Sequence, residues 1–232
     1  MLDAAEFDKF AEEYLAAHAQ NLKVSGEGPD YFARYKIDEL ARLWAKRKIP
    51  PPATILDFGC GIGASLPHLR RQFPTARLTG VDVSARSLEI AAARFPDLAQ
   101  LVLAKDGAAP VAAASQDLIF TACVFHHIPQ DHHVALFADL RARLTAKGAL
   151  VVFEHNPLNP VTRYIVATCP FDENAVLISA ASLRARLQAA GFSQVEIRFT
   201  GFFPGPLAAL RPLEPLLNQI PIGAQYYALA TA

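Results

Sequence analysis

The sequence predicts an α/β fold in which helices cover both faces of a mostly parallel sheet. Short apolar runs alternate along the chain with segments of helical periodicity. A glycine-rich turn at residues 59–63 directly follows the first of these runs. Repeated strand–helix units of this kind build a parallel sheet, because each helix returns the chain to the same end of the sheet.

The apolar runs have the length and composition expected of strands that are buried on both faces. They cover residues 54–58, 77–83, 100–103, 116–122, 149–153, 194–199 and 224–231. Helices are expected at about residues 31–48, 65–72, 85–94, 132–144 and 182–190. Ser84 and Asp131 are the expected caps of the third and fourth helices. No long helix separates the last two strands, which indicates an antiparallel end to the sheet.

The length of 232 residues suits one domain, residues 1–232, with additional segments outside its strand–helix units. Residues 1–50 are expected to form a helical extension that three consecutive prolines end. Two stretches, 154–180 and 202–221, interrupt the strand–helix rhythm and are longer than ordinary connections. We expect both insertions to act as lids on the acceptor side of the site.

Composition and charge disfavour several classes of protein. The 22 Lys and Arg residues are balanced by 22 Asp and Glu residues, so there is no electrostatic footprint for nucleic acid. No apolar run reaches the roughly 18 residues that a membrane span needs, and the acidic N-terminus does not fit a signal peptide. Cys60, Cys123 and Cys169 fit neither a disulfide framework nor a zinc motif. We therefore expect a soluble, cytoplasmic protein.

The strongest chemical signal is the turn after the first strand, where Asp57 precedes Gly59, Gly61 and Gly63. Glycines let the backbone lie against a ligand, although they can also simply make a tight turn. The spacing of Gly59, Gly61 and Ala64 formally satisfies the dinucleotide-binding fingerprint too, so the glycines do not by themselves exclude a nicotinamide cofactor. The Asp57 carboxylate would repel a pyrophosphate and attract the ammonium group and sulfonium charge of S-adenosylmethionine. The charge therefore favours S-adenosylmethionine.

Two further acidic residues follow the second and third strands. Asp82 lies 19 positions after Gly63, where a carboxylate can accept hydrogen bonds from both hydroxyls of a ribose. Asp106 can accept a hydrogen bond from an adenine amine, although Asp106–Gly107 is also an ordinary turn pair. Together these residues predict an adenosine site.

The chain resembles the class I S-adenosylmethionine-dependent methyltransferase superfamily, close to its small-molecule branch. The matching residues are 57–63, Asp82, Asp106–Gly107, 117–120 and 126–129. The resemblance implies a Rossmann-like, seven-stranded sheet in the order 3-2-1-4-5-7-6, with the last strand antiparallel. It also implies cofactor binding by Asp57, Gly59, Cys60, Gly61, Asp82, Val83, Asp106 and Gly107, and by an aromatic residue of an N-terminal helix, here Tyr14.

The fourth strand leads into His126 and His127, which are expected near the ligand-binding end of the sheet. Either could act as a general base, since the ordinary pKa of histidine lies near neutrality. Alternatively, one ring packs under the cofactor and the other hydrogen-bonds the backbone. Asp131, His132 and His133 follow, but a helix cap and an exposed first turn explain them better than ligands do. We therefore expect no metal.

The fifth strand delivers a polar segment, Glu154 to Arg163, to the same end of the sheet. It is either a surface loop whose Asn–Pro pairs make turns or one wall of an acceptor site. In the second interpretation, which we favour, Glu154 or His155 takes a proton from the acceptor, while Asn156 and Arg163 bind it. Residues 169–172 would then belong to a lid.

The leucines of the 202–221 insertion have helical spacing. This pattern indicates core packing or a homodimer contact. It also fits an apolar wall for a hydrophobic or lipid-linked acceptor.

Taken together, the motifs predict an enzyme that transfers a methyl group from S-adenosylmethionine to a small-molecule acceptor, with oxygen favoured as the methylated atom. A non-catalytic methyltransferase-like binding protein is one alternative. A nicotinamide-dependent oxidoreductase is another, with less support because the sequence offers no recognisable hydride-transfer residues. The acceptor and the oligomeric state are left open.

Overall fold

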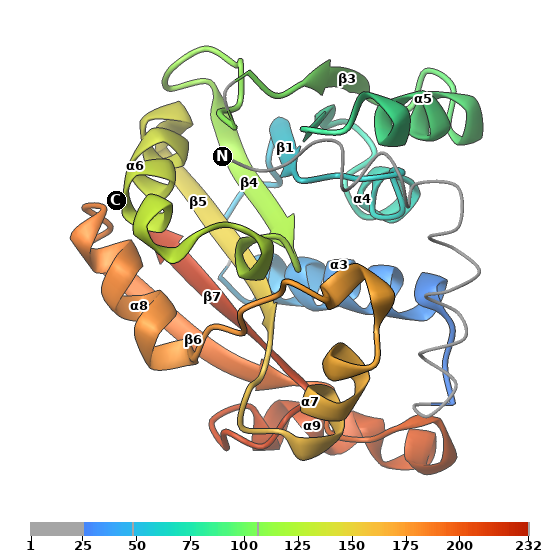
Figure 1. Cartoon of the computed structure of the whole chain (residues 1–232). Coiled ribbons are helices and arrows are strands. Elements are labelled where there is room, and N and C mark those ends of the chain that lie inside the picture. The colour runs from blue at the N-terminus through green and yellow to red at the C-terminus, as the bar shows by residue number, and fades with distance from the viewer. Residues whose placement is uncertain (1–25, 48, 106, 232) are drawn as a thin grey trace.

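The computed structural model describes residues 26–47, 49–105 and 107–231. These residues form a seven-stranded sheet in the order β3-β2-β1-β4-β5-β7-β6 (Figure 1). The strands are β1 (Thr54–Phe58), β2 (Arg77–Asp82), β3 (Gln100–Leu103), β4 (Gln116–Ala122), β5 (Leu144–His155), β6 (Gln194–Thr200) and β7 (Gln225–Thr231). β1 to β5 pair in parallel, and β7 runs antiparallel to β5 and β6. The predicted order and antiparallel end are confirmed.

Helices cover both faces of this sheet. Successive residues of a strand point to opposite faces, so an apolar strand gives each face an apolar surface for helices to bury. Ile55 packs in one core with Trp44 of α3, and the adjacent Leu56 packs in the other core with Phe137 of α6. The helices are α3 (Pro29–Arg47), α4 (Leu66–Gln72), α5 (Ala85–Arg94), α6 (His133–Arg143), α7 (Pro160–Ala167), α8 (Ala180–Ala189) and α9 (Glu214–Leu217). Short 3₁₀ segments are η2 (Phe125–His127), η3 (Gln130–His132), η4 (Pro170–Asp172) and η5 (Gly205–Leu213).

The two predicted helix caps have different outcomes. Ser84 caps α5, since its side chain accepts a hydrogen bond from the Ser87 N–H at 3.0 Å. The prediction for Asp131 is wrong, because it lies exposed in η3, two residues before α6 begins. The expected exposure of His133 is also wrong: its ring is buried and contacts the Ile128 carbonyl and the Arg186 guanidinium of α8.

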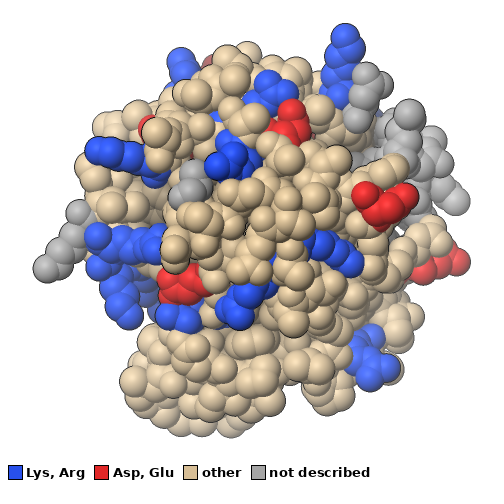
Figure 2. Space-filling model, turned by 90° about the vertical axis from the view of Figure 1, so that its left-hand side faces the viewer, with Lys and Arg blue, Asp and Glu red and all other residues tan. Residues whose placement is uncertain are grey.

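The 202–221 insertion forms η5 and α9 at the lower edge of the molecule in Figure 1. Its leucines are largely exposed, Leu216 reaching 79%, so they do not pack in the core. Figure 2 shows that the lowest part of one face carries mainly uncharged residues, with Lys or Arg atoms at its right-hand side. Among the described residues, no helix has the length and hydropathy required to span a membrane.

Glu214 fastens this insertion to α3. Its Oε1 accepts hydrogen bonds from the N–H groups of Phe202 and Phe203 at 3.0 and 3.1 Å. Its Oε2 accepts one from the hydroxyl of Tyr35, which also hydrogen-bonds Thr200 at the end of β6. The carboxylate is buried, so these donors have no access to water as a substitute partner.

Replacing this carboxylate should therefore destabilise the fold. We expect Glu214→Ala to lower the free energy of unfolding by about 2–3 kcal/mol, because it leaves buried donors unpaired. Glu214→Gln retains a carbonyl oxygen for the two N–H groups and should lose less. Urea denaturation of the three proteins measures the difference, and equal stability of Glu214→Ala and the parent would contradict the anchoring role.

Candidate active site

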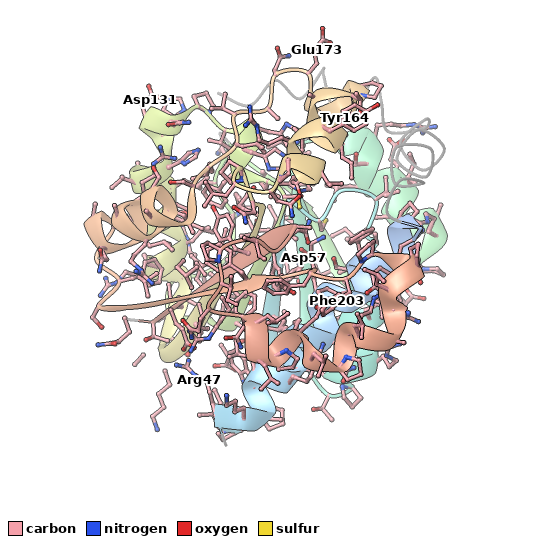
Figure 3. The ribbon with its side chains drawn as sticks, turned by 90° about the horizontal axis from the view of Figure 1, so that it is seen from below. Arg47, Asp57, Asp131, Tyr164, Glu173 and Phe203 are labelled. Atoms are coloured by element: carbon pink, nitrogen blue, oxygen red, sulfur yellow. The ribbon has the colours of Figure 1, made fainter. Side chains whose placement is uncertain are left out.

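A cavity of about 740 Å³ opens at the carboxyl ends of the central strands, where open α/β sheets bind their ligands. Residues that follow β1, β2, β4 and β5 line it, together with side chains of α3, α7 and the segment before η5. Figure 3 shows Asp57 near the middle of the molecule, with α7, which carries Tyr164, and the η5 segment on either side. The volume is within the range of pockets that hold small organic ligands.

The glycine turn forms one end of this cavity. Gly59 and Cys60 donate backbone hydrogen bonds to the Val81 carbonyl at 2.8 and 3.0 Å, which holds the turn against β2. Gly59 is required by packing, since a Cβ there would lie 2.3 Å from Cγ2 of Val124. Gly61 has a φ of +50°, and a Cβ there would meet no heavy atom within 4 Å, so its backbone faces open space. A ligand can approach the chain closely at this point.

Asp57 is a buried carboxyl group with unfulfilled bonding capacity. It is 3% exposed, and its Oδ2 has no hydrogen-bond partner among the described residues. Burial, together with the nearby charge of Asp82, raises the pKa of Asp57 to about 8. A cationic group bound at the adjacent turn would stabilise the ionised form. The site thus fits the ammonium and sulfonium charges expected of its cofactor.

Asp82 borders the same end of the cavity. Its two oxygens accept hydrogen bonds from the N–H groups of Gly61 at 2.7 Å and Ser84 at 2.9 Å, so the carboxylate joins two turns. Cys60 and Val83 also line the cavity, whereas Asp57 and Gly107 do not. The remaining predicted cofactor residues, Tyr14 and Asp106, lie outside the described residues.

The other end of the cavity carries a histidine cluster supported by Glu154. The Oε1 of Glu154 accepts a hydrogen bond from the Phe125 N–H at 2.9 Å, and its Oε2 lies 2.6 Å from Nδ1 of His126. His126 Nε2 lies 3.4 Å from Oδ1 of Asp172 in η4. Burial opposes a charge on His126, but the neighbouring carboxylates of Glu154 and Asp172 hold its pKa well above the usual value.

His127 and Asp172 complete this cluster. Nε2 of His127 lies 3.5 Å from the same Oδ1 of Asp172. Burial and the neighbouring charge of His126 lower the pKa of His127 to about 4. Burial acts in the opposite sense on Asp172, but its contacts with His126 lower the pKa of this carboxyl to about 2.

The lining of the cavity also includes Cys123, His155 and Lys36. Burial raises the pKa of the Cys123 thiol, but His155 and Lys36 outweigh it and bring the pKa to about 7. The amide of Gln225 lies 3.5 Å from Nδ1 of His155 and 3.6 Å from Sγ of Cys123. Lys36 belongs to α3, is 8% exposed and makes no hydrogen bond or ion pair with any other described residue.

The structure does not bring Asn156 and Arg163 into the cavity lining. The amide of Asn156 is buried and donates hydrogen bonds to the carbonyls of Pro221 and Gly223, so it joins the two insertions. Arg163 points to solvent on α7, whose residues Val161, Thr162 and Ile165 face the cavity instead. Glu154 is likewise absent from the lining and acts on the cavity through His126.

Sequence reasoning missed Lys36, and it gave Asp172 only a place in a lid segment. Each lies far along the chain from the residues that it approaches. Lys36 belongs to a helix before the sheet, and Asp172 follows α7 within the first insertion. No local pattern distinguishes Asp172 from a surface charge. A search for charged residues within otherwise apolar helix faces would have selected Lys36.

Known proteins resemble this chain in sequence and in fold. The model of a methyltransferase domain family matches residues 30–197. Trans-aconitate 2-methyltransferase of Methylobacterium nodulans is 31% identical over 175 residues, which are 73% of this chain and 64% of that protein. Malonyl-[acyl-carrier protein] O-methyltransferase of Hahella chejuensis is 36% identical over 101 residues, 43% of this chain and 36% of that protein. The chain thus spans less than two thirds of these curated relatives.

Solved structures extend the likeness to the whole fold. An S-adenosylmethionine-dependent methyltransferase of Thermotoga maritima superposes with a TM-score of 0.66 at 18% identity and covers 98% of both chains. At that identity the likeness concerns the fold alone. The family match, in contrast, includes both the glycine turn and the histidine cluster. This chain belongs to the S-adenosylmethionine-dependent methyltransferases.

Proposed function

We propose that this chain transfers the methyl group of S-adenosylmethionine to a carboxylate oxygen of a small organic acid. The observation that carries the proposal is Lys36, which is buried in the cavity wall and makes no hydrogen bond or ion pair with a described residue, although its charge lowers the pKa of the Cys123 thiol. A buried charge is costly unless it is paired. An acceptor with a carboxylate supplies the missing partner.

The side chains around the acceptor end support an acceptor that is already ionised. Both oxygens of Glu154 are hydrogen-bonded, and both ring nitrogens of His126 face carboxylates. His155 lies beside the amide of Gln225. A hydroxyl acceptor needs a base with a free acceptor atom, whereas a carboxylate needs none. We therefore assign Glu154 and His126 a positioning role rather than proton abstraction.

The names of the curated relatives support the same class of acceptor. Trans-aconitate and the malonyl group of the carrier-linked acceptor are both carboxylic acids. The cavity walls of this chain include apolar side chains such as Phe32, Phe203 and Ile165. An acid with an apolar portion would fit these walls, and the exclusion of water would leave its carboxylate more reactive.

At the other end of the cavity, the proposed roles concern the cofactor. S-adenosylmethionine supplies an electrophilic methyl group on a positively charged sulfur atom. Asp57 attracts the positive charge, Asp82 accepts hydrogen bonds from the ribose, and the Gly61 backbone lies against the ligand. The chain aligns the two reactants for in-line displacement and needs no covalent intermediate.

The proposed activity can be tested with S-adenosylmethionine that carries a radiolabelled methyl group and a panel of mono-, di- and tricarboxylic acids. A methyl ester releases its label as methanol in alkali, whereas an ether or an N-methyl group keeps it. We expect alkali-labile label with at least one acid. Alkali-stable label, or none with any acid, would contradict the proposal.

Asp57 should lower the stability of the cofactor-free protein. Its pKa is about 8 in the fold and 3.8 ordinarily, so between these values the unfolded chain ionises while the folded carboxyl keeps its proton. Stability is therefore lost as pH rises from about 4 to 8. Asp57→Asn should raise the Tm of the cofactor-free protein by several degrees at pH 8 and by less at pH 5.

The same variant should bind S-adenosylmethionine at least tenfold more weakly in a calorimetric titration, since an interaction with a charged group is lost. Asp131→Asn, at an exposed position, is the matched control and should change neither property. Unaltered affinity in Asp57→Asn would show that this carboxyl does not contact the cofactor's charge.

Lys36→Met should raise KM for the acid roughly tenfold or more through loss of a charged contact, while the Kd for S-adenosylmethionine stays within twofold. Lys46→Met changes an exposed lysine of the same helix and serves as control. Decarboxylated S-adenosylmethionine tests whether Lys36 instead binds the carboxylate of the cofactor. If Lys36→Met weakens binding of S-adenosylmethionine but not of its decarboxylated form, Lys36 binds the cofactor's carboxylate and the proposed role is wrong.

A further inference from the structure

We propose that His126, His127 and Asp172 bind a divalent transition-metal ion, with Zn²⁺ as the best match, at the acceptor end of the cavity. All three residues line the cavity, and one ligand atom from each lies within 4.8 Å of the others. The sequence led us to expect no metal, because a helix cap and an exposed first turn explained Asp131, His132 and His133. The ligands proposed here come together only in the folded chain.

The distances within the cluster fit a metal site better than hydrogen bonds. Oδ1 of Asp172 lies 3.4 Å from Nε2 of His126 and 3.5 Å from Nε2 of His127. Both separations exceed a normal hydrogen bond. Ligands that lie 2.0–2.2 Å from a tetrahedral zinc ion are roughly 3.3–3.6 Å apart. The two distances from the Asp172 oxygen to the histidine nitrogens therefore match a tetrahedral site of two histidines and one carboxylate.

Glu154 provides the support that a histidine ligand requires. Its Oε2 accepts a hydrogen bond from Nδ1 of His126 at 2.6 Å, which fixes the ring with Nε2 turned toward Asp172 and the position proposed for the ion. Its Oε1 is itself held by the Phe125 N–H. Carboxylate–histidine–metal arrangements of this kind are the rule in metal centres. Metal binding would thus give the buried Glu154–His126 pair a function in addition to packing.

The backbone holds the ligands in place before any ion arrives. His126 and His127 form η2 directly after β4, and the Val176 N–H donates to the His126 carbonyl at 2.8 Å. The Asp172 N–H donates to the Cys169 carbonyl at 3.0 Å. The segment with Asp172 is therefore joined to the segment with the histidines by main-chain contact.

Three protein ligands leave a tetrahedral ion with one open position. The cluster and Lys36 line the same cavity, so both can act on one bound acceptor. This role in acceptor binding rests on the proposed function. The binding of the ion itself does not.

The test uses the full chain, treated with a chelator and then titrated with ZnCl₂ or MgCl₂ in a calorimeter. We expect one Zn²⁺ per chain with a Kd of micromolar or below, and no binding of Mg²⁺ in the same range, since the site offers two imidazole ligands. His127→Gln and Asp172→Asn should weaken Zn²⁺ binding at least 100-fold. Glu154→Gln should weaken it 10- to 100-fold.

His132→Gln, an exposed histidine in the next 3₁₀ segment, is the matched control and should bind Zn²⁺ as the parent does. Thermal unfolding of each variant shows whether it is folded. Absence of Zn²⁺ binding would overturn the proposal. Binding that survives Asp172→Asn but is lost in Cys123→Ser would also overturn it, because the ion would then lie at the thiol.

The two proposals can fail separately. Alkali-labile methylation of an acid by chelator-treated protein that binds no Zn²⁺ would overturn the metal site alone. Stoichiometric Zn²⁺ binding by a chain that methylates no acid would overturn the carboxylate acceptor alone.

Discussion

The parallel pairing of β1 with β2 on one side and β4 on the other is the constraint on which the rest of the site depends. The connections after β1 and β4 diverge at this point, so a cleft opens at the carboxyl end of the sheet. The register sets Asp57 beside Gly80 of β2. A Cβ at Gly80 would lie 2.9 Å from Sγ of Cys60. The glycine turn can therefore fold back over β2 only because residue 80 lacks a side chain.

The cofactor end of the cavity could be predicted from the sequence because its chemistry is local. Asp57 and Gly61 belong to one continuous motif, and Asp82 ends the next strand. Strand ends of a parallel sheet meet at one edge, so these residues converge once the strands are recognised. The strand order is not local, and it was expected only through resemblance to a family.

The acceptor end could not be predicted in the same way, because tertiary contacts decide which polar groups remain available. His133 looked exposed at the start of a helix, but Arg186 of α8 covers it. Asn156 looked available to an acceptor, but its amide joins two insertions through Gly223. Lys36, by contrast, makes no hydrogen bond or ion pair with a described residue. Which polar group is satisfied within the fold depends on partners far along the chain.

Two buried groups of opposite charge are poorly compensated within the chain, Asp57 just before the glycine turn and Lys36 in the cavity wall. Asp57 has an oxygen without a partner, and Lys36 makes no ion pair with a described residue. Each lowers the stability of the empty protein and favours binding of the ligand that compensates it.

The proposed reaction would change this balance at the moment of transfer. A carboxylate that receives a methyl group becomes a neutral ester, so Lys36 loses its counter-ion. The cavity then holds the product less firmly than the acid, since an uncharged ester gains little from a buried ammonium. The negative charge through which Lys36 binds the acceptor is thus lost in the reaction. Release of the product therefore needs no further structural feature.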